Sequence, residues 1–140
     1  MPHVLSTVQV EHYQREGYLL AGDLFTTAEL DVLERELDDF MGRRLRNAAQ
    51  VDVTWSGDWK KDQPPTELQH THDVQAYSAA WARVLTHDRF TGAFADLLGP
   101  NVALHHTKAF IKPPERGSAF PMHQDYPYFP HVLGTMMAAI

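Results

Sequence analysis

The chain has 140 residues and a formal net charge of −6. This length holds one domain with a real core, and the acidic balance argues against nucleic-acid or anionic-membrane partners, which select Lys and Arg. The chain contains no cysteine, which excludes disulfide bonds and thiolate metal sites, and we expect a cytoplasmic protein because neither a secretory signal nor a stretch of transmembrane length is visible.

The first predicted elements are a helix and a short strand. Thr7 can cap a helix that ends at Gly17, because a hydroxyl accepts from the free N–H groups of a first turn and glycine adopts the left-handed cap conformation. Residues 18–21, Tyr-Leu-Leu-Ala, then have the apolar character of a short strand.

The best-defined element is a helix over about residues 27–44. Thr26 followed by Glu29 has the spacing of a capping box. Apolar residues then recur at helical intervals and form one stripe, which predicts core packing: Leu30, Leu33, Leu37, Phe40 and Met41.

Residues 47–73 form an irregular stretch rich in Gly, Asp, Pro and Lys, which contains Trp55 and Trp59. A loop of this length in a small domain is usually functional or mobile. It is either a lid over a pocket or a loop held in place by its two aromatic residues, and the sequence does not decide between them.

Two short helices precede a change of period. Ser78 can cap a helix that runs to Leu85, and Asp88 can cap a second helix that ends at Gly99. The pattern then becomes extended, with strands predicted over residues 102–112, 120–125 and 133–140 and a turn at residues 113–117. Helices followed by strands predict an α+β fold, in a single domain over residues 1–140.

The last residues, 135–140, are apolar and end without a polar turn, a charge or a cap. Loose tails are usually polar. We therefore expect a chain that is truncated within its core.

His123 and Asp125 form the strongest candidate for a metal site. On an extended backbone, residues i and i+2 face the same side, so the imidazole and the carboxylate converge. These two ligand types, with open positions beside them, suit a redox-active Fe(II) centre. Chance alone yields roughly 0.7 such pairs among nine His and eleven Asp, so the specificity has to come from the surrounding sequence.

Two segments around this pair resemble the phytanoyl-CoA dioxygenase family. Residues 105–117, HHTKAFIKPPERG, resemble the strand and turn before that family's metal motif, and residues 120–130, FPMHQDYPYFP, resemble its iron-binding segment. The turn at residues 16–18, the Leu-rich helix and the sequence LLGP at residues 97–100 follow in the family's order and spacing. The resemblance covers nearly the whole chain.

The resemblance implies an Fe(II)- and 2-oxoglutarate-dependent dioxygenase that hydroxylates a small-molecule substrate. It implies N-terminal helices packed on a cupin-like jelly roll (a double-stranded β-helix), with His123 and Asp125 as iron ligands. Lys108 stands where the family places a residue beside the co-substrate, and its ammonium can bind a 2-oxoglutarate carboxylate; otherwise it is one exposed position on a strand. A second such residue is expected among Gln69, His70 and His72, and we select His70.

In this family a second His and an Arg further along the chain complete the site for the metal and the co-substrate, and later strands complete the jelly roll. Ile140 lies fifteen residues after Asp125, so we expect two ligands and an open sheet here. A second chain or a missing C-terminal segment could complete the barrel. The alternatives to an active dioxygenase are a catalytically inactive truncated fragment and a cupin-like binding or interaction protein.

Two other His pairs offer weaker metal sites. His70 and His72 share the i, i+2 spacing of the main candidate, but such a pair in a loop more often lies on the surface or lines a pocket. His105 and His106 are expected to face opposite sides of a strand, and therefore not to share one ion.

Overall fold

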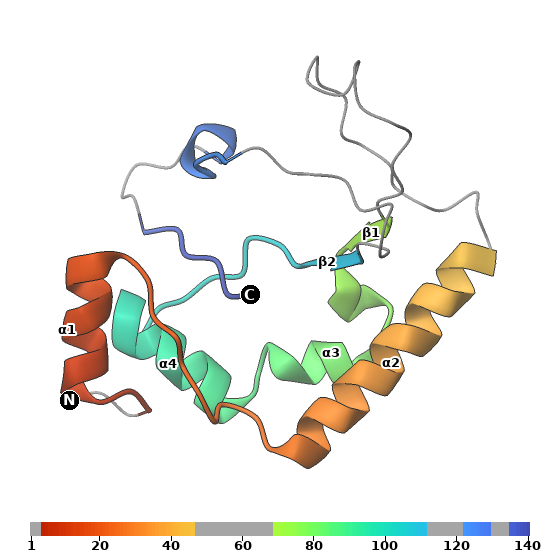
Figure 1. The fold of residues 1–140 in the computed structure, drawn as a ribbon, viewed down its shortest axis with the longest axis horizontal. Helices are drawn as coiled ribbons and strands as arrows, with labels where there is room; N and C mark the ends of the chain where they lie inside the picture. The colour runs from red at the N-terminus through yellow and green to blue at the C-terminus, as the bar shows by residue number, and fades with distance from the viewer. Residues whose placement is uncertain (1–3, 47–68, 112–121, 130–134) are drawn as a thin grey trace.

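The computed structural model describes residues 4–46, 69–111, 122–129 and 135–140, and helices are its main regular elements (Figure 1). In chain order the elements are α1 (Thr7–Glu16), α2 (Thr27–Arg46), β1 (Gln69–His72), the 3-10 turn η3 (Val74–Ala76), α3 (Ala79–Val84), α4 (Asp88–Leu98), β2 (Lys108–Ile111) and the 3-10 turn η4 (Tyr126–Tyr128). Contacts join α2 to α3 and α1 to α4. Helices with a small antiparallel sheet agree with the predicted α+β class, and the sheet of the described residues has two strands.

α1 begins one residue earlier than the sequence predicts, because Ser6 is its N-cap and not Thr7. The Ser6 hydroxyl accepts a hydrogen bond from the backbone N–H of Gln9 (3.3 Å), and the side-chain oxygen of Gln9 accepts one from the N–H of Ser6 (2.9 Å). This reciprocal capping box satisfies two N–H groups of the first turn. Gly17 ends the helix as predicted, with a φ of 81° that suits glycine.

The strand predicted at residues 18–21 is wrong. Within the described part of the chain these residues have no partner strand, and they form an irregular connection between α1 and α2. Tyr18 and Leu20 are exposed, Leu20 by 87%. An apolar run forms a strand only where another strand pairs with it, and local composition does not reveal that partner.

α2 confirms the predicted capping box and runs to Arg46. The Thr26 N–H donates to Glu29 Oε2 (2.6 Å), and the Glu29 N–H donates to Thr26 Oγ1 (3.3 Å). The apolar stripe is buried toward the end of the helix, where Phe40 is 2% exposed, whereas Leu30 is half exposed. The core cluster consists of Phe40, Met41 and Val74, with Leu37, Trp81, Ala109 and Ile111 packed around it.

β1 and β2 form an antiparallel pair in which His72 lies opposite Lys108 and His70 lies opposite Phe110. Since directly opposed residues share a face, one face of the pair carries His72, Lys108 and Phe110, and the other carries Thr71, Ala109 and Ile111. The second face packs on the core cluster. We call the face that carries His72, Lys108 and Phe110 the outer face. β1 falls inside the stretch predicted to be irregular, and its pairing with a segment almost forty residues later explains why the local pattern did not reveal it.

The strand predicted at residues 102–112 is shorter than expected. Residues 101–107 are irregular, and β2 begins at Lys108, because β1 offers only four residues to pair with. Lys112 and the turn predicted at residues 113–117 lie outside the described residues. Of the other two predicted strands, the described parts, residues 122–125 and 135–140, are not strands.

α3 begins as predicted, since the Ser78 hydroxyl accepts from the Trp81 N–H (3.4 Å) and also donates to Glu36 Oε2 of α2 (2.8 Å). In α4, His87 is the N-cap and Asp88 is the first helical residue, so the predicted cap is wrong by one position.

Glu29 joins the start of α2 to the start of α4. The His87 ring Nε2 lies 3.1 Å from Glu29 Oε1, and Arg89 donates to Glu29 Oε2 (2.8 Å) and to the Leu24 carbonyl (2.8 Å). These bonds add to the capping bonds from Thr26. One carboxylate therefore caps a helix and also ties two helices together.

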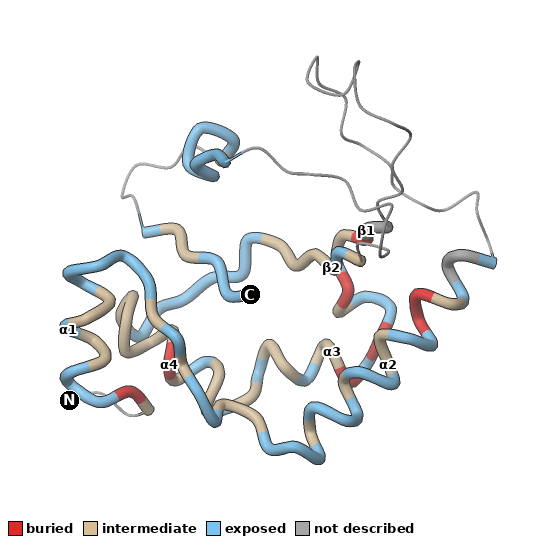
Figure 2. Tube along the Cα trace, viewed as in Figure 1, coloured by how far each residue is buried: buried red, intermediate tan, exposed pale blue. Residues whose placement is uncertain are grey.

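The segment before α1 docks on α4. The N–H groups of Val4 and Leu5 both donate to Asp96 Oδ2, each at 2.8 Å, and Leu5 is buried. Gly92 makes this close approach possible, because a Cβ there would lie 2.5 Å from Val4 Cγ2. Figure 2 shows buried positions in two separate places, one at this contact and one around the core cluster.

Among the described residues, no helix combines the length and the apolarity needed to cross a bilayer.

Candidate metal centre

His123 and Asp125 lie together, with 3.3 Å between His123 Nε2 and Asp125 Oδ1. The backbone that carries them is not a strand: residues 122–124 are irregular, and Asp125 has helical angles as the residue before η4. The Asp125 carbonyl accepts a hydrogen bond from the Tyr128 N–H (2.9 Å), and the His123 ring meets the Tyr128 ring edge-on at 5.9 Å. This tight turn, and not an extended backbone, brings the two side chains together.

The separation of the two side chains fits a shared metal ion. Nitrogen and oxygen ligands at about 2.0–2.2 Å from a metal, at right angles to each other, lie about 2.9–3.1 Å apart. The 3.3 Å between His123 and Asp125 is close to this value. Both side chains are open to solvent, 36% and 54% exposed. In the described part of the chain no group of three His, Cys, Asp or Glu side chains could hold a metal, so a metal at this pair would have two candidate ligands.

Lys108, at the start of β2, lies within electrostatic reach of Asp125. Burial lowers the pKa of Lys108, and the negative charge of Asp125 acts in the opposite direction. The Lys108 Nζ also lies 4.7 Å from the centroid of the Phe110 ring. The outer face of the strand pair thus carries an ammonium group that interacts electrostatically with one of the two candidate ligands. His70 occupies a register position on the same face, and its side chain lies outside the described part.

Three imidazoles gather beside Lys108. The Nδ1 atoms of His105 and His106 lie 2.6 Å apart, and the ring of His72 lies 6.0 Å from that of His106. Phe129 packs against both rings of the pair, at 4.8 and 5.3 Å. Burial lowers the pKa of His106, and the charges of His105, Lys108 and His72 lower it further.

The prediction that His105 and His106 face opposite sides of a strand is therefore wrong. It assumed a strand from residue 102, but the strand begins at Lys108, and the irregular backbone before it lets both rings turn to the same side.

Thr107 fixes the position of this segment, a role that the sequence did not indicate. Its hydroxyl accepts from the Val74 N–H (3.0 Å) and donates to the side-chain oxygen of Gln75, and its carbonyl accepts from the Asp73 N–H (2.9 Å). These bonds join the end of β1 to the residues before β2. The partners lie more than thirty residues apart, so no local sequence signal marks them.

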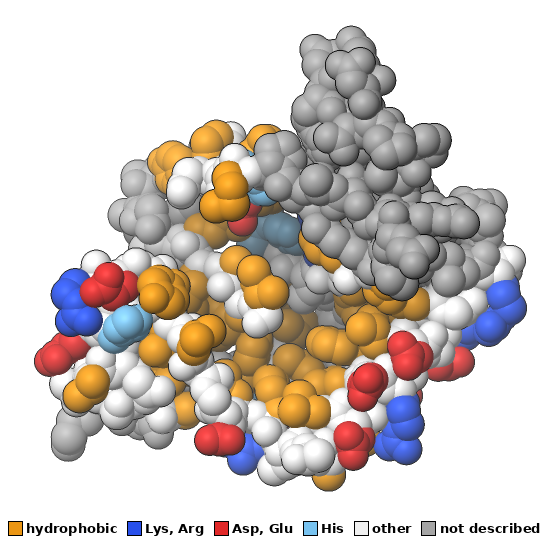
Figure 3. Space-filling view, viewed as in Figure 1, with side chains coloured by type: hydrophobic (Ala, Val, Ile, Leu, Met, Phe, Trp, Pro, Cys, Tyr) orange, Lys and Arg blue, Asp and Glu red, His pale blue; other side chains and the backbone are white. Residues whose placement is uncertain are grey.

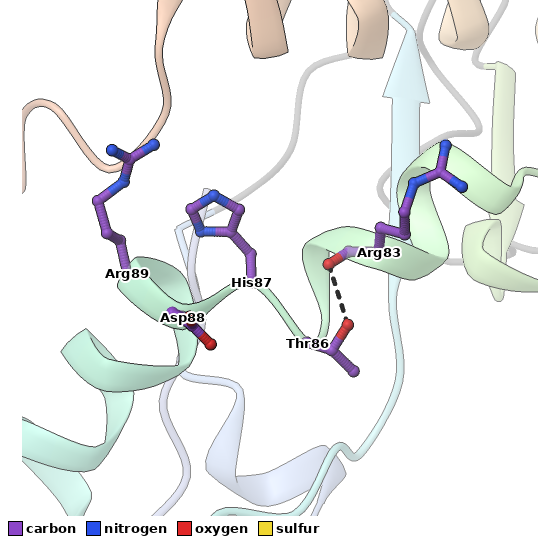
Figure 4. A pocket seen from close by; sticks show the side chains of 5 residues that line it. All are labelled: Arg83, Thr86, His87, Asp88 and Arg89. Carbon is purple, nitrogen blue, oxygen red and sulfur yellow. Dashed lines mark hydrogen bonds between the residues drawn. The ribbon is translucent and has the colours of Figure 1, made fainter.

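The hollow shown in Figure 4 is a different place. It has a volume of about 550 Å³ and is lined by Arg83, Thr86, His87, Asp88 and Arg89. The Asp88 side chain points to the opposite side from those of His87 and Arg89, and the Arg83 side chain lies apart from them (Figure 4). His87 and Arg89 are already engaged by Glu29. Because its polar groups diverge and none is a candidate ligand, this hollow does not compete with the site at His123 and Asp125.

Comparison with known proteins agrees with the resemblance of the motifs. The family model for phytanoyl-CoA dioxygenase (PhyH) matches residues 13–139. An ectoine dioxygenase of Bordetella parapertussis is 28% identical over 127 residues, which cover 87% of this chain and 37% of that protein. The peroxisomal phytanoyl-CoA dioxygenase of Homo sapiens is 28% identical over 136 residues, which cover 91% of this chain and 39% of that protein.

The chain thus spans less than two fifths of the length of these curated relatives. No solved structure is significantly similar to it. The family model nevertheless covers almost all of the chain, including the segment with His123 and Asp125. The chain belongs to the phytanoyl-CoA dioxygenase family.

Proposed function

We propose that this chain is the iron-binding part of an Fe(II)- and 2-oxoglutarate-dependent dioxygenase that hydroxylates a small organic substrate. The observation that carries the proposal is the 3.3 Å approach of His123 to Asp125 within a segment that the dioxygenase family model matches. An imidazole and a carboxylate side by side are the ligand types of non-haem Fe(II) oxygenases. When bound, Fe(II) supplies the dioxygen chemistry that no side chain can provide.

In this proposal each side chain has a separate role. His123 Nε2 and Asp125 Oδ1 hold the metal, and the retained carboxylate favours hydroxylation. Lys108 donates a charge-assisted hydrogen bond to a carboxylate of 2-oxoglutarate, and His70 contributes a second polar contact. The charge of Asp125 helps Lys108 to stay protonated against the effect of burial.

We further propose that a later segment or a second chain completes the jelly roll and supplies the remaining metal ligand and an Arg. Two observations support this. The relatives are more than twice as long as this chain. In addition, large apolar side chains lie exposed, and Figure 3 shows apolar side chains gathered over the hollowed middle of one face. The exposed apolar side chains include Val102, Leu104, Phe110 and Met122. Apolar surface of this kind usually marks an interaction site.

The alternative is a cupin-like binding protein, or a fragment without catalysis. The finding that favours it is the presence of only two convergent ligands in the described residues. The relatives are named for ectoine and for phytanoyl-CoA, so we leave the substrate at the level of a small organic molecule. A cytoplasmic location stays a prediction, based on the absence of cysteine and of a visible secretory signal in the sequence.

Anaerobic titration with Fe(II) and 2-oxoglutarate tests the proposal. We expect a visible charge-transfer band that His123→Ala abolishes and that His12→Ala retains. His12 is the matched control because it is also a histidine, lies in α1 and contacts Tyr18 instead of the candidate site. No band in the parent chain, or a band unchanged in His123→Ala, rejects iron binding by this chain.

A further inference from the structure

His105 and His106 meet in a head-on hydrogen bond that the proposed iron site does not use. The two Nδ1 atoms lie 2.6 Å apart, and the ring centroids lie 4.9 Å apart. At this separation a single hydrogen lies between the two nitrogen atoms, so that one Nδ1 donates and the other accepts. We call these two residues the His pair.

The His pair can take up one proton without losing this bond, but not two. In the neutral state one hydrogen lies between the rings, and a second is carried by one of the two Nε2 atoms. A first added proton goes to the other Nε2 and leaves the bond intact. A second added proton has to go to the accepting Nδ1, and two N–H groups then face each other. The hydrogen bond is therefore lost in the doubly charged pair.

The groups that face the His pair act against the second proton. Burial lowers the pKa of His106, and the positive charges of His105, Lys108 and His72 lower it further. The Asp73 carboxylate acts in the opposite direction. Three of these four groups repel a proton and one attracts it, so the bond is expected to break below the ordinary histidine pKa of about 6.5.

The His pair also supplies the surface on which Phe129 packs, with ring centroids 4.8 and 5.3 Å away. Phe129 belongs to the tight turn that carries the candidate iron ligands. Its N–H donates to the Tyr126 carbonyl (3.2 Å), and the Tyr128 N–H donates to the Asp125 carbonyl (2.9 Å). Because these bonds hold the turn together, the place of Phe129 on the His pair also sets the place of Asp125.

From these contacts we infer that the His pair docks residues 122–129 beside the strand pair and releases them in acid, when both of its rings become charged. The backbone of the His pair stays in place, because Thr107 bonds to Val74 and Asp73. The rings therefore turn apart, and Phe129 loses the paired surface beneath it. The effect on iron binding rests on the proposed function, whereas the docking itself does not.

Nuclear Overhauser spectra without metal test the docking, because they report contacts between the ring protons of Phe129 and His106. We expect these cross-peaks to weaken at least about threefold between about pH 7.5 and about pH 5, the range in which histidine titrates. Cross-peaks that are absent at the higher pH, or equally strong at the lower pH, overturn the inference. Since no metal is present, this result is independent of the Fe(II) titration.

His105→Asn separates the hydrogen bond from general effects of acid. The Asn amide both donates and accepts, so it can bond to His106 Nδ1 whether or not that nitrogen carries a hydrogen, and it does not titrate. We therefore expect the cross-peaks between Phe129 and His106 to persist in acid in this variant. A loss as large as in the parent chain rejects the His pair as the cause.

Two controls complete the experiment. His12→Asn makes the same exchange in α1, where His12 contacts Tyr18, and it should leave the pH dependence of the Phe129 contact unchanged. The stacked rings of Phe40 and Tyr77, with centroids 5.4 Å apart, report on the core and should keep their cross-peaks in acid. If both ring contacts disappear together, acid unfolds the whole protein and the inference fails.

Discussion

Gly92 is expected to be a position where even a methyl group destabilises the protein. The contact of the N-terminal segment with α4 leaves no room there, since a Cβ would lie 2.5 Å from Val4 Cγ2. Ordinary contacts between carbon atoms begin about 1 Å further out. Val4 cannot simply withdraw, because its N–H and that of Leu5 are both bonded to Asp96.

The magnitude follows from two opposing effects. Replacing a mid-helix glycine by alanine stabilises a helix by about 1 kcal/mol. Overpacking a close contact costs about 1–3 kcal/mol, and the loss of a hydrogen bond to the Asp96 carboxylate costs about 1.5–3 kcal/mol. The two costs together exceed the helix gain, so we expect Gly92→Ala to lower the free energy of unfolding by about 1.5–5 kcal/mol.

Gly42 in α2 is the matched control. Among the described residues, a Cβ at Gly42 would meet only the guanidinium Nη1 of Arg46, at 3.5 Å, which is an ordinary contact with the far end of a flexible side chain. Gly42→Ala is therefore expected to stabilise the protein by about 0.5–1 kcal/mol. Urea unfolding of the two variants and the parent, followed by circular dichroism, measures the difference. If Gly92→Ala proves as stable as Gly42→Ala, the close packing of Val4 on α4 is refuted.

Three further predictions concern single side chains. Hydrogen bonds from Thr26 and His87 lower the pKa of Glu29 from 4.5 to about 2, so its stabilising effect is complete above about pH 4.5 and is lost as the pH falls toward 2. Urea unfolding at several pH values should thus show a smaller acid-induced loss of stability in Glu29→Gln than in the parent. Thr71 is fully buried, and its hydroxyl has no hydrogen-bond partner among the described residues. Thr71→Val should therefore raise the free energy of unfolding by about 1 kcal/mol, and an unchanged or lower value contradicts this. Lys108→Met should weaken 2-oxoglutarate binding about tenfold in the anaerobic titration, with partial recovery in Lys108→Arg, and equal binding in all three chains removes Lys108 from the co-substrate site.

Some features could be predicted from the sequence because their physical cause is local. The capping box of Thr26 and Glu29, the Ser78 cap and the Gly17 stop all depend on hydrogen bonds or backbone angles within a few residues. The family could also be recognised locally, from the segments that flank His123. The errors at Thr7 and Asp88 are shifts of one residue in helix starts that were otherwise placed correctly.

The tertiary structure decided the features whose partners are distant along the chain. The β1–β2 register places His72 opposite Lys108, and the bonds of Thr107 to Val74 let the His105 and His106 rings meet. A strand needs a partner and a buried face, and neither can be read from four residues such as Gln-His-Thr-His. The sequence alone determined which residue types are available for metal chemistry, whereas non-local pairing decided which of them share one place.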